Sequence, residues 1–324
     1  MTPLRVSLAL CAALLAVPLS GAAQELRKAI PRIGVLWPNP PQTFEPFKQG
    51  MRDLGYVEGR NINYEFRDAR NKLDQLDEMA GELVRQKVDV ILCLAPPAAF
   101  AAKRATQTIP IVFVAIGDPL ADGLVASMAH PGGNVTGTTR MLSEMSAKNL
   151  ALLKEAVPSL ARVAVLWNPA NSSHATALKE VDATARSLSL QLRPMEVRSP
   201  AEFDAVFAAI GEQRADGVLL LADPLFFIHL KRLMDLAAAK RLPSASSWTE
   251  LPDAGGLLGY ATSLAYEFRN AARYVDRILK GAKPGELPVQ QPTNFEFVIN
   301  LKTAKALGLT IPREVLLRAD RVIE

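Results

Sequence analysis

The sequence predicts an α/β fold made of two lobes, each built around a mostly parallel sheet. Short apolar runs alternate with longer segments of helical periodicity, and this alternation starts again near the middle of the chain after a glycine-rich segment. Strands that alternate with helices of this length are typical of βαβ units. Of the 324 residues, 49% are hydrophobic and 22% are charged, which indicates a globular rather than a disordered protein.

In the first half, apolar runs or strict alternation predict strands, and apolar residues spaced three or four apart predict helices. The expected strands are Arg32–Trp37, Ile62–Phe66, Val88–Leu94 and Ile111–Ile116. The expected helices are Pro46–Leu54, Leu73–Gln86 and Ala98–Ala105. The strands from Val88 and from Ile111 are apolar runs, which favours burial on both faces of a parallel sheet.

The second half repeats this organisation. Its expected strands are Val163–Trp167, Leu190–Val197 and Gly217–Leu221, and its expected helices are Ser146–Ala156, Ser172–Leu188, Pro200–Ile210 and Phe226–Ala239. Arg32–Trp37 and Arg162–Trp167 both end in tryptophan and precede an Asn/Pro loop and a helix, so the halves predict lobes of like topology. Pro131–Gly137 fits a hinge crossing between them, and Gly255–Gly259 fits a second crossing.

The N-terminal segment Met1–Ala23 has the pattern of a cleaved secretory signal. Arg5 precedes the apolar run Val6–Val17, and the small residues Gly21 and Ala23 precede the expected cleavage site. The apolar run has about 12 residues, too few to span the hydrocarbon core of a membrane. We therefore expect an exported, soluble protein, with an uncleaved membrane anchor as the alternative.

Charge and reactive side chains exclude several classes of function. The net charge of +4 is spread along the chain without a Lys/Arg-rich block, so we expect no nucleic-acid partner. Cys93 is the one cysteine after the signal and lies in an apolar run, which predicts a buried, unreactive thiol. His130, His174 and His229 lack metal-ligand spacing, and no Ser-His-Asp arrangement stands out, so we expect no metal, cofactor or catalytic site.

Candidate ligand-binding residues follow the predicted strands, because ligands of open parallel sheets bind at the carboxyl ends of the strands. In the first half they are Trp37, Asn39, Thr43, Phe44, Pro96, Pro97, Gly117, Asp118 and Pro119. In the second half they are Asn168, Asn171, Ser172, Asp223, Pro224, Ser246, Trp248 and Tyr260.

These residue types suit a small ligand with polar and aromatic parts. Asn171–Ser173 opens a predicted helix, and the free N–H groups of such a terminus attract a carboxylate. Asp118 or Asp223 would pair with an ammonium group, and tryptophans such as Trp37 would stack on an aromatic part. In the alternative interpretation, both aspartates only cap helices and the tryptophans pack into the core.

Several segments carry a resemblance to a known family: Gly50–Ile62, Thr108–Phe113, Gly117–Pro119, His130–Gly137, Val165–Pro169 and Asn300–Leu309. They extend over nearly the whole chain after the signal and resemble the substrate-binding proteins of ABC importers typified by tryptophan/tyrosine-binding receptors. The resemblance implies a type I periplasmic-binding fold, with two Rossmann-like lobes, three hinge crossings and a ligand held between the lobes. It also implies delivery of the ligand to an ABC permease in the inner membrane, driven by a cytoplasmic ATPase.

From the resemblance we expect lobe 1 to comprise residues 30–138 and 260–298, and lobe 2 to comprise residues 139–259 and 299–324. The expected function is capture of a small molecule by a periplasmic monomer without a cofactor. The expected ligand is an aromatic or other amino acid, or a small carboxylate. An exported enzyme and a sensory receptor on the same scaffold are the alternatives, and the sequence does not separate the receptor from a transport protein.

Overall fold

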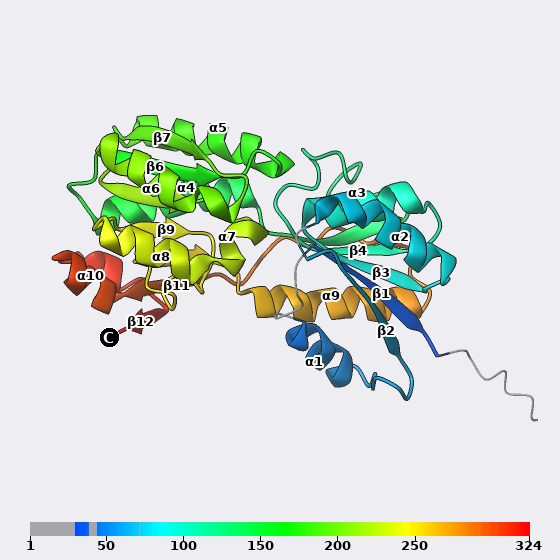
Figure 1. Cartoon of the computed structure of the whole chain (residues 1–324). Coiled ribbons are helices and arrows are strands. Elements are labelled where there is room, and N and C mark those ends of the chain that lie inside the picture. Colours follow the sequence, from blue (N-terminus) through cyan, green and yellow to red (C-terminus); the bar gives the residue numbers. More distant parts are fainter. Residues whose placement is uncertain (1–29, 39–43, 71) are drawn as a thin grey trace, which may run out of the picture. The chain divides into compact units, whose positions relative to one another are not determined.

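The computed structural model describes residues 30–38, 44–70 and 72–324. The expected signal Met1–Ala23 lies outside the described residues, as do the site candidates Asn39 and Thr43. From Pro31 onward the described chain forms two α/β lobes, each with one sheet that carries helices on both faces (Figure 1). This is the two-lobed, parallel-sheet architecture that the sequence predicts.

The first sheet has five parallel strands in the order β2-β1-β3-β4-β5. Its strands are β1 (Arg32–Trp37), β2 (Asn63–Asp68), β3 (Val90–Leu94), β4 (Ile111–Ile116) and β5 (Val135–Thr139). The apolar strands β1, β3 and β4 occupy the centre of the sheet, where both faces are covered, and β2 with its polar residues lies at an edge.

Strand β5 corrects one expectation. The segment Pro131–Gly137 was expected to cross between the lobes, but Val135–Thr139 pairs with β4 in the first sheet. A Cβ atom on Gly137 would lie 2.0 Å from the carbonyl oxygen of Phe113, so only glycine allows this pairing. Glycine at this position therefore allows β5 to approach β4 closely, and it is not part of a hinge.

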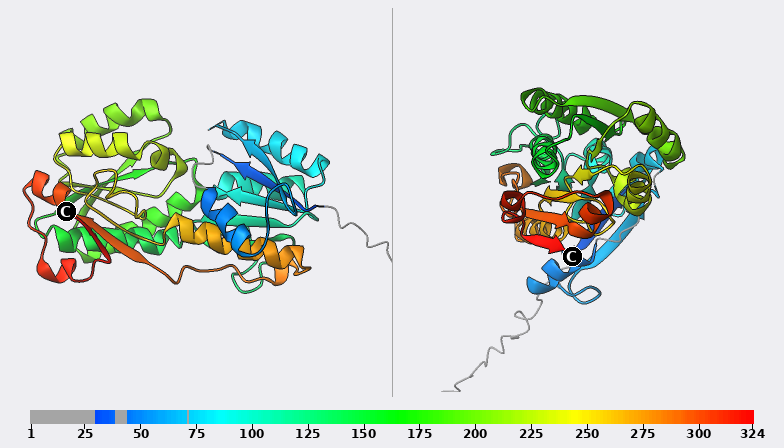
Figure 2. Two further views of the ribbon diagram at one scale, coloured as in Figure 1. Left: turned by 90° about the horizontal axis from the view of Figure 1, so that it is seen from below. Right: turned by 90° about the vertical axis from the view of Figure 1, so that its left-hand side faces the viewer.

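Helices from distant parts of the sequence cover the first sheet. One face carries α1 (Glu45–Asp53) and α9 (Leu264–Leu279), and the other carries α2 (Leu76–Arg85) and α3 (Ala95–Ala105) (Figures 1 and 2). The short helices η1 (Leu73–Gln75) and η3 (Pro284–Glu286) flank this lobe. The apolar side of α9, including Phe268, Ala271 and Val275, is buried in the same core as β1 and β3.

The second sheet has seven strands in the order β12-β11-β10-β9-β8-β6-β7. They are β6 (Arg162–Trp167), β7 (Gln191–Glu196), β8 (Gly217–Leu220), β9 (Ser244–Ser246), β10 (Leu258–Ala261), β11 (Glu296–Asn300) and β12 (Arg321–Ile323). All neighbours pair in parallel except β10 and β11. One face carries α4 (Leu142–Ala156), α5 (Ser172–Ser187), α10 (Leu301–Leu307) and α11 (Arg313–Leu316), and the other carries η2 (Pro200–Glu202), α6 (Phe203–Glu212), α7 (Pro224–Ile228) and α8 (Leu230–Ala239).

Several helices differ from their expected bounds, among them α3, which begins at Ala95 rather than Ala98. Helix α4 begins at Leu142, before the expected Ser146, and the expected helix Phe226–Ala239 is divided at His229 into α7 and α8. None of the helices in the described part of the chain is long and apolar enough to cross a membrane.

The chain passes between the two lobes three times, as the type I periplasmic-binding fold requires. The crossings are Arg140–Met141 after β5, Thr262–Ser263 after β10, and residues 291–295 before β11. The first-lobe segment expected at 260–298 is too long at both ends, because β10 and β11 pair with each other in the second sheet. Strands that are hydrogen-bonded to each other belong to the same sheet, so β10 and β11 both belong to the second lobe.

Candidate functional site

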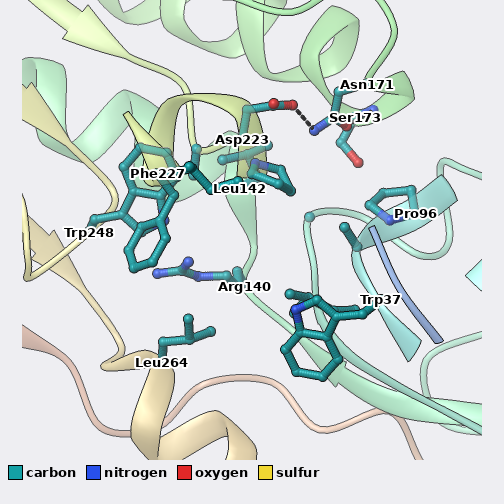
Figure 3. A pocket seen from close by; sticks show the side chains of 16 residues that line it. Trp37, Pro96, Arg140, Leu142, Asn171, Ser173, Asp223, Phe227, Trp248 and Leu264 are labelled. Atoms are coloured by element: carbon teal, nitrogen blue, oxygen red, sulfur yellow. Dashed lines mark hydrogen bonds between the residues drawn. The ribbon is translucent and has the colours of Figure 1, made fainter. Parts of the chain in front are cut away.

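A cavity of about 110 Å³ lies between residues of both lobes, at the carboxyl ends of several strands (Figure 3). Trp37 ends β1, Leu94 ends β3 and Gly117 follows β4 in the first lobe, and Ala222 and Asp223 follow β8 in the second. Of the sequence candidates, those lining this cavity are Trp37, Pro96, Gly117, Asn171, Asp223, Pro224 and Trp248.

A neighbouring cavity of about 270 Å³ shares part of these walls. The shared residues are Ala95, Asn171, Asp223 and Pro224, and the candidates Pro97 and Asn168 line the second cavity. The two cavities are therefore neighbours that both border on Asp223.

Tryptophans from the two lobes provide the aromatic walls of the first cavity. Trp37 stacks on Phe268 of α9, with ring centroids 5.4 Å apart and an angle of 14° between the planes. Trp248 lies against Phe227 of α7, at a centroid distance of 5.4 Å. Both tryptophans are buried but reach the cavity with part of their surface, so they are held by packing and still available to a ligand (Figure 3).

Asp223 is the acidic group of the cavity and is only 4% exposed. Its Oδ1 accepts hydrogen bonds from the Leu225 amide at 2.9 Å and from Asn168 Nδ2 at 3.3 Å, and its Oδ2 accepts one from Asn171 Nδ2 at 2.9 Å. The residue therefore caps α7, as the alternative interpretation expected, and it also lines the cavity. A carboxylate has roughly four lone-pair positions, so about one remains for a ligand donor.

His174 stabilises the position of Asp223 through hydrogen bonds to neighbouring backbone groups. Its Nδ1 accepts a hydrogen bond from the Asn168 amide at 2.9 Å, so Nε2 carries the proton and donates to the Ala222 carbonyl oxygen at 3.1 Å. Burial lowers the pKa of His174, although Asp223 lies 3.9 Å away. A neutral imidazole that joins the loop after β6 to the segment just before Asp223 is a structural element of the site.

The N-terminus of α5 lies at the cavity and has protein partners for some of its polar groups. Asn171 caps the helix by accepting a hydrogen bond from the Ser173 amide, and the Ser173 hydroxyl donates to Asp122 Oδ2 at 2.8 Å. Asp122 follows β4, so a first-lobe carboxylate lies beside the terminus that the sequence proposes for a ligand carboxylate. Burial raises the pKa of Asp122, and its hydrogen bonds with Ser173 and Ser172 act in the opposite direction.

Gly117 allows this approach of the two lobes. A Cβ atom at this position would lie 2.9 Å from Ser173 Cβ and 3.0 Å from Leu142 Cβ, both closer than ordinary contacts. The absence of a side chain at Gly117 is therefore a steric requirement of the cavity wall.

The remaining candidates within the described residues line neither cavity. Asp118 accepts a hydrogen bond from the Ala121 amide at 2.9 Å and so stabilises its own loop, which continues through Pro119. Phe44 packs within the first-lobe core against Trp37, and Ser172 is exposed at the start of α5.

Two second-lobe candidates are also held away from the cavities. The Ser246 hydroxyl donates to the Leu220 carbonyl oxygen inside the second sheet, at 2.8 Å. The Tyr260 ring stacks on Phe295, with ring centroids 5.4 Å apart. Both lie on second-sheet strands or beside them, where strand pairing decides the direction of the side chain.

Several lining residues escaped the sequence analysis, namely Leu94, Ala95, Arg140, Leu142, Ser173, Ala222, Phe227, Ile228 and Leu264. Arg140 is the most informative of them, because it is charged and only 8% exposed. Its Nη2 donates to the Ser247 carbonyl oxygen at 2.7 Å, and its Nε lies 3.5 Å from Glu267 Oε1. Arg140 follows the unrecognised strand β5, and a basic residue after a strand is the one signal that could have found it.

Glu267, the partner of Arg140, is 2% exposed on α9. Burial raises the pKa of this carboxyl to about 7, against the lowering effect of Arg140. No group of three histidine, cysteine, aspartate or glutamate side chains suited to a metal ion occurs in the described part of the chain.

The comparisons with known proteins agree on one family. Residues 38–323 match the family model described as ABC transporter substrate binding protein. A tyrosine-binding protein of Clostridioides difficile (strain R20291) is 27% identical over 264 residues, which cover 81% of this chain and 75% of the relative.

Two solved structures are similar over almost their whole length. A conserved domain protein from Vibrio cholerae has a TM-score of 0.84 and 27% identity, over 90% of this chain and 99% of that one. An ABC domain from Streptococcus pneumoniae in complex with L-Trp has a TM-score of 0.84 and 25% identity, over 90% and 99% of the two chains.

Proposed function

Because the chain belongs to the family of ABC transporter substrate-binding proteins, we propose that it captures an aromatic amino acid between its lobes and delivers it to an ABC permease. The observation that carries this proposal is the cavity around Trp37, which combines aromatic walls with one acidic and one basic side chain. The tyrosine-binding relative and the similar structure in complex with L-Trp support the same ligand class.

The chemistry of the cavity suits a zwitterion with an aromatic side chain. Asp223 retains an acceptor position for an ammonium group, and the opposite charge of Arg140 lies in the same cavity. Trp37 and Trp248 would enclose the ring of the ligand by edge or face contacts. A few well-placed polar groups within an apolar lining are typical of small-molecule sites.

Capture would work through closure of the two lobes on the ligand. We assign residues 31–139 and 264–290 to lobe 1 and residues 142–261 and 296–324 to lobe 2, following the sheet that each element covers or joins. A ligand shifts the equilibrium towards the closed state only by its differential affinity for that state. Contacts from both lobes, such as those of Trp37 and Asp223, provide that difference.

The proposed setting is the periplasm. Export would follow cleavage of the signal Met1–Ala23, and the working form would be a monomer that docks on the permease of the inner membrane. In this function the protein binds and releases its ligand without chemical change, and it has no catalytic role.

A thermal-shift screen of the chain beginning at Gln24 tests the proposal. The protein is first unfolded and refolded to remove any bound ligand. Aromatic and other amino acids, small carboxylates, nucleosides and sugars are then added one at a time. A ligand at 100 times its dissociation constant adds about 2.7 kcal/mol to the free energy of unfolding, which raises the melting temperature by several degrees. We expect this shift with tyrosine or tryptophan. A shift with sugars or nucleosides alone would overturn the ligand class, and turnover of a bound compound would favour an enzyme.

A further inference from the structure

The carboxylate of an amino acid needs a hydrogen-bond donor, and three helix N-termini at the cavity are unsuited to supply it. At α5 the position is taken by Asp122 of the first lobe, through the Ser173 hydroxyl. At α3 the first residues are Ala95, Pro96 and Pro97, and the two prolines have no N–H group.

Helix α4 is occupied in a similar way. The amide of Leu142, its first residue, donates to the Gly117 carbonyl oxygen at 3.1 Å, and Glu144 supplies a negative charge in the first turn. Helix termini normally attract anions, but at each of these three a protein group already takes part of this role or prolines remove donors. A cationic side chain in the cavity is the stronger partner for the carboxylate of the ligand.

Among the described residues that line the cavity, Arg140 is the only one with a cationic side chain. Its Nη2 is held by the Ser247 and Thr262 carbonyl oxygens, at 2.7 and 3.4 Å, and its Nε faces Glu267. Among the described residues, no protein acceptor hydrogen-bonds to Nη1. Figure 3 shows the side chain between Trp248 and Trp37.

The charge of Arg140 is only partly balanced by the protein. The contact of 3.5 Å with Glu267 Oε1 is longer than a normal charged hydrogen bond, and this oxygen has no hydrogen-bond partner in the described part of the chain. Burial also raises the pKa of Glu267 to about 7, so near neutral pH this carboxyl is in part uncharged. A second carboxylate beside the guanidinium would complete its hydrogen bonding.

We propose that Arg140 binds the carboxylate of the ligand and makes the site selective for amino acids over the corresponding amines. The inference rests on the proposed function and names the residue that binds the carboxylate end of the ligand. The ligand would lie with its carboxylate at Arg140, its ammonium towards Asp223 and its ring against one of the two tryptophans. Arg140 lies on the first crossing, so the same contact would join the ligand to the hinge.

Isothermal titration of the refolded chain tests this with two amino acids, tryptophan and tyrosine, and the amines tryptamine and tyramine, which lack the carboxylate. The variants are Arg140→Gln and Arg140→Lys, with Arg186→Gln as a control, because Arg186 is exposed in the last turn of α5 and lines neither cavity. A charged hydrogen bond accounts for about tenfold to hundredfold in affinity. We expect Arg140→Gln to lose that much affinity for the amino acid and little for the amine, and Arg140→Lys to restore part of it. Arg186→Gln should match the wild type.

A double variant, Arg140→Gln/Glu267→Gln, removes both buried charges and keeps the test valid if the single variant does not fold. Equal losses for amino acid and amine would overturn the inference and leave Arg140 as a support of the hinge alone. Failure of the wild-type chain to bind either amino acid would overturn the proposed function, and this inference with it.

Discussion

The pair formed by Arg140 and Glu267 brings opposite charges together at the hinge, where both side chains are almost fully buried. Taking charges out of water is costly unless they are paired and hydrogen-bonded. Glu267 has incomplete hydrogen bonding, and its Oε2 accepts only a 3.4 Å bond from Thr138. Its carboxyl therefore binds a proton more readily in the folded chain than in the unfolded chain.

This predicts a pH dependence of stability. The pKa of Glu267 rises from 4.5 to about 7 on folding, so its contribution is fully present below pH 4.5 and is lost as the pH rises through 7. The shift corresponds to about 3 kcal/mol. Urea unfolding at pH 5 and pH 8 should show this loss in the wild type and not in Glu267→Gln. Glu286 is exposed, so Glu286→Gln is the control and should keep the pH dependence of the wild type. Parallel pH profiles for the wild type and Glu267→Gln would contradict the assignment.

Replacement of Gly117 by alanine is expected to act through a steric clash. The added methyl group of Gly117→Ala would press on Ser173 and Leu142, and overpacking of this kind costs about 1–3 kcal/mol. We expect the affinity for the bound amino acid to fall by about fivefold to hundredfold, measured by isothermal titration. Gly81→Ala, on the outer side of α2 in the same lobe, should leave affinity unchanged. Unaltered binding by Gly117→Ala would mean that the lobes do not approach each other here in the bound state.

Part of the candidate site could be predicted from single residues. Trp37, Asn171 and Asp223 line the cavity because they follow buried strands, and strand ends are visible as the ends of apolar runs. Ser246 also lies at a strand end, yet its hydroxyl turns towards the Leu220 carbonyl oxygen, and a one-residue difference in register decides this direction. Arg140 was missed because its strand is rich in threonine and glycine rather than apolar residues.

At the scale of elements, the loop after β4 and helix α5 meet at Asp122. Asp122 belongs to the first lobe and Ser173 lies at the start of a second-lobe helix, so their hydrogen bond of 2.8 Å joins the lobes beside the cavity. The positive end of the α5 dipole favours a carboxylate there. A contact of this type stabilises one arrangement of the lobes over others.

We therefore expect Asp122→Ala and Ser173→Ala each to weaken amino-acid binding by about threefold to tenfold, the range of one hydrogen bond. The double variant should be no weaker than the more affected single variant, because both changes remove the same bond. A double-mutant cycle by isothermal titration measures this coupling. Strictly additive effects would show that Asp122 and Ser173 act independently.

The elements themselves were largely predictable, since their patterns are local. Strand β1 and strand β4 have the expected bounds, and α5 differs from its prediction by one residue at its end. Strand β5 was missed because Gly137 and its neighbours are suited to a turn in isolation, and only the closeness of Phe113 explains a strand. Helix α4 extends back to Leu142 because tertiary contact with Gly117 orders its first turn.

At the scale of the whole chain, three crossings join two sheets, each of which packs against its own helices. Each sheet has apolar cores on both faces, so a change at the crossings can alter how the lobes meet without exposing either core. Helix α9 shows the limit of sequence reasoning here. Its apolar face indicates burial, but periodicity does not say which sheet it covers, and that assignment came from the family resemblance.

The central claim is that an aromatic amino acid binds once per chain between the lobes, and direct titration tests it most simply. The measurement is isothermal titration of tyrosine and tryptophan into the chain beginning at Gln24, after unfolding and refolding in the absence of ligand. The account predicts saturable binding of at least one of them at one molecule per chain, strongly reduced in Trp37→Ala and in Asp223→Asn. No binding of either amino acid, or binding that both variants retain unchanged, would contradict it.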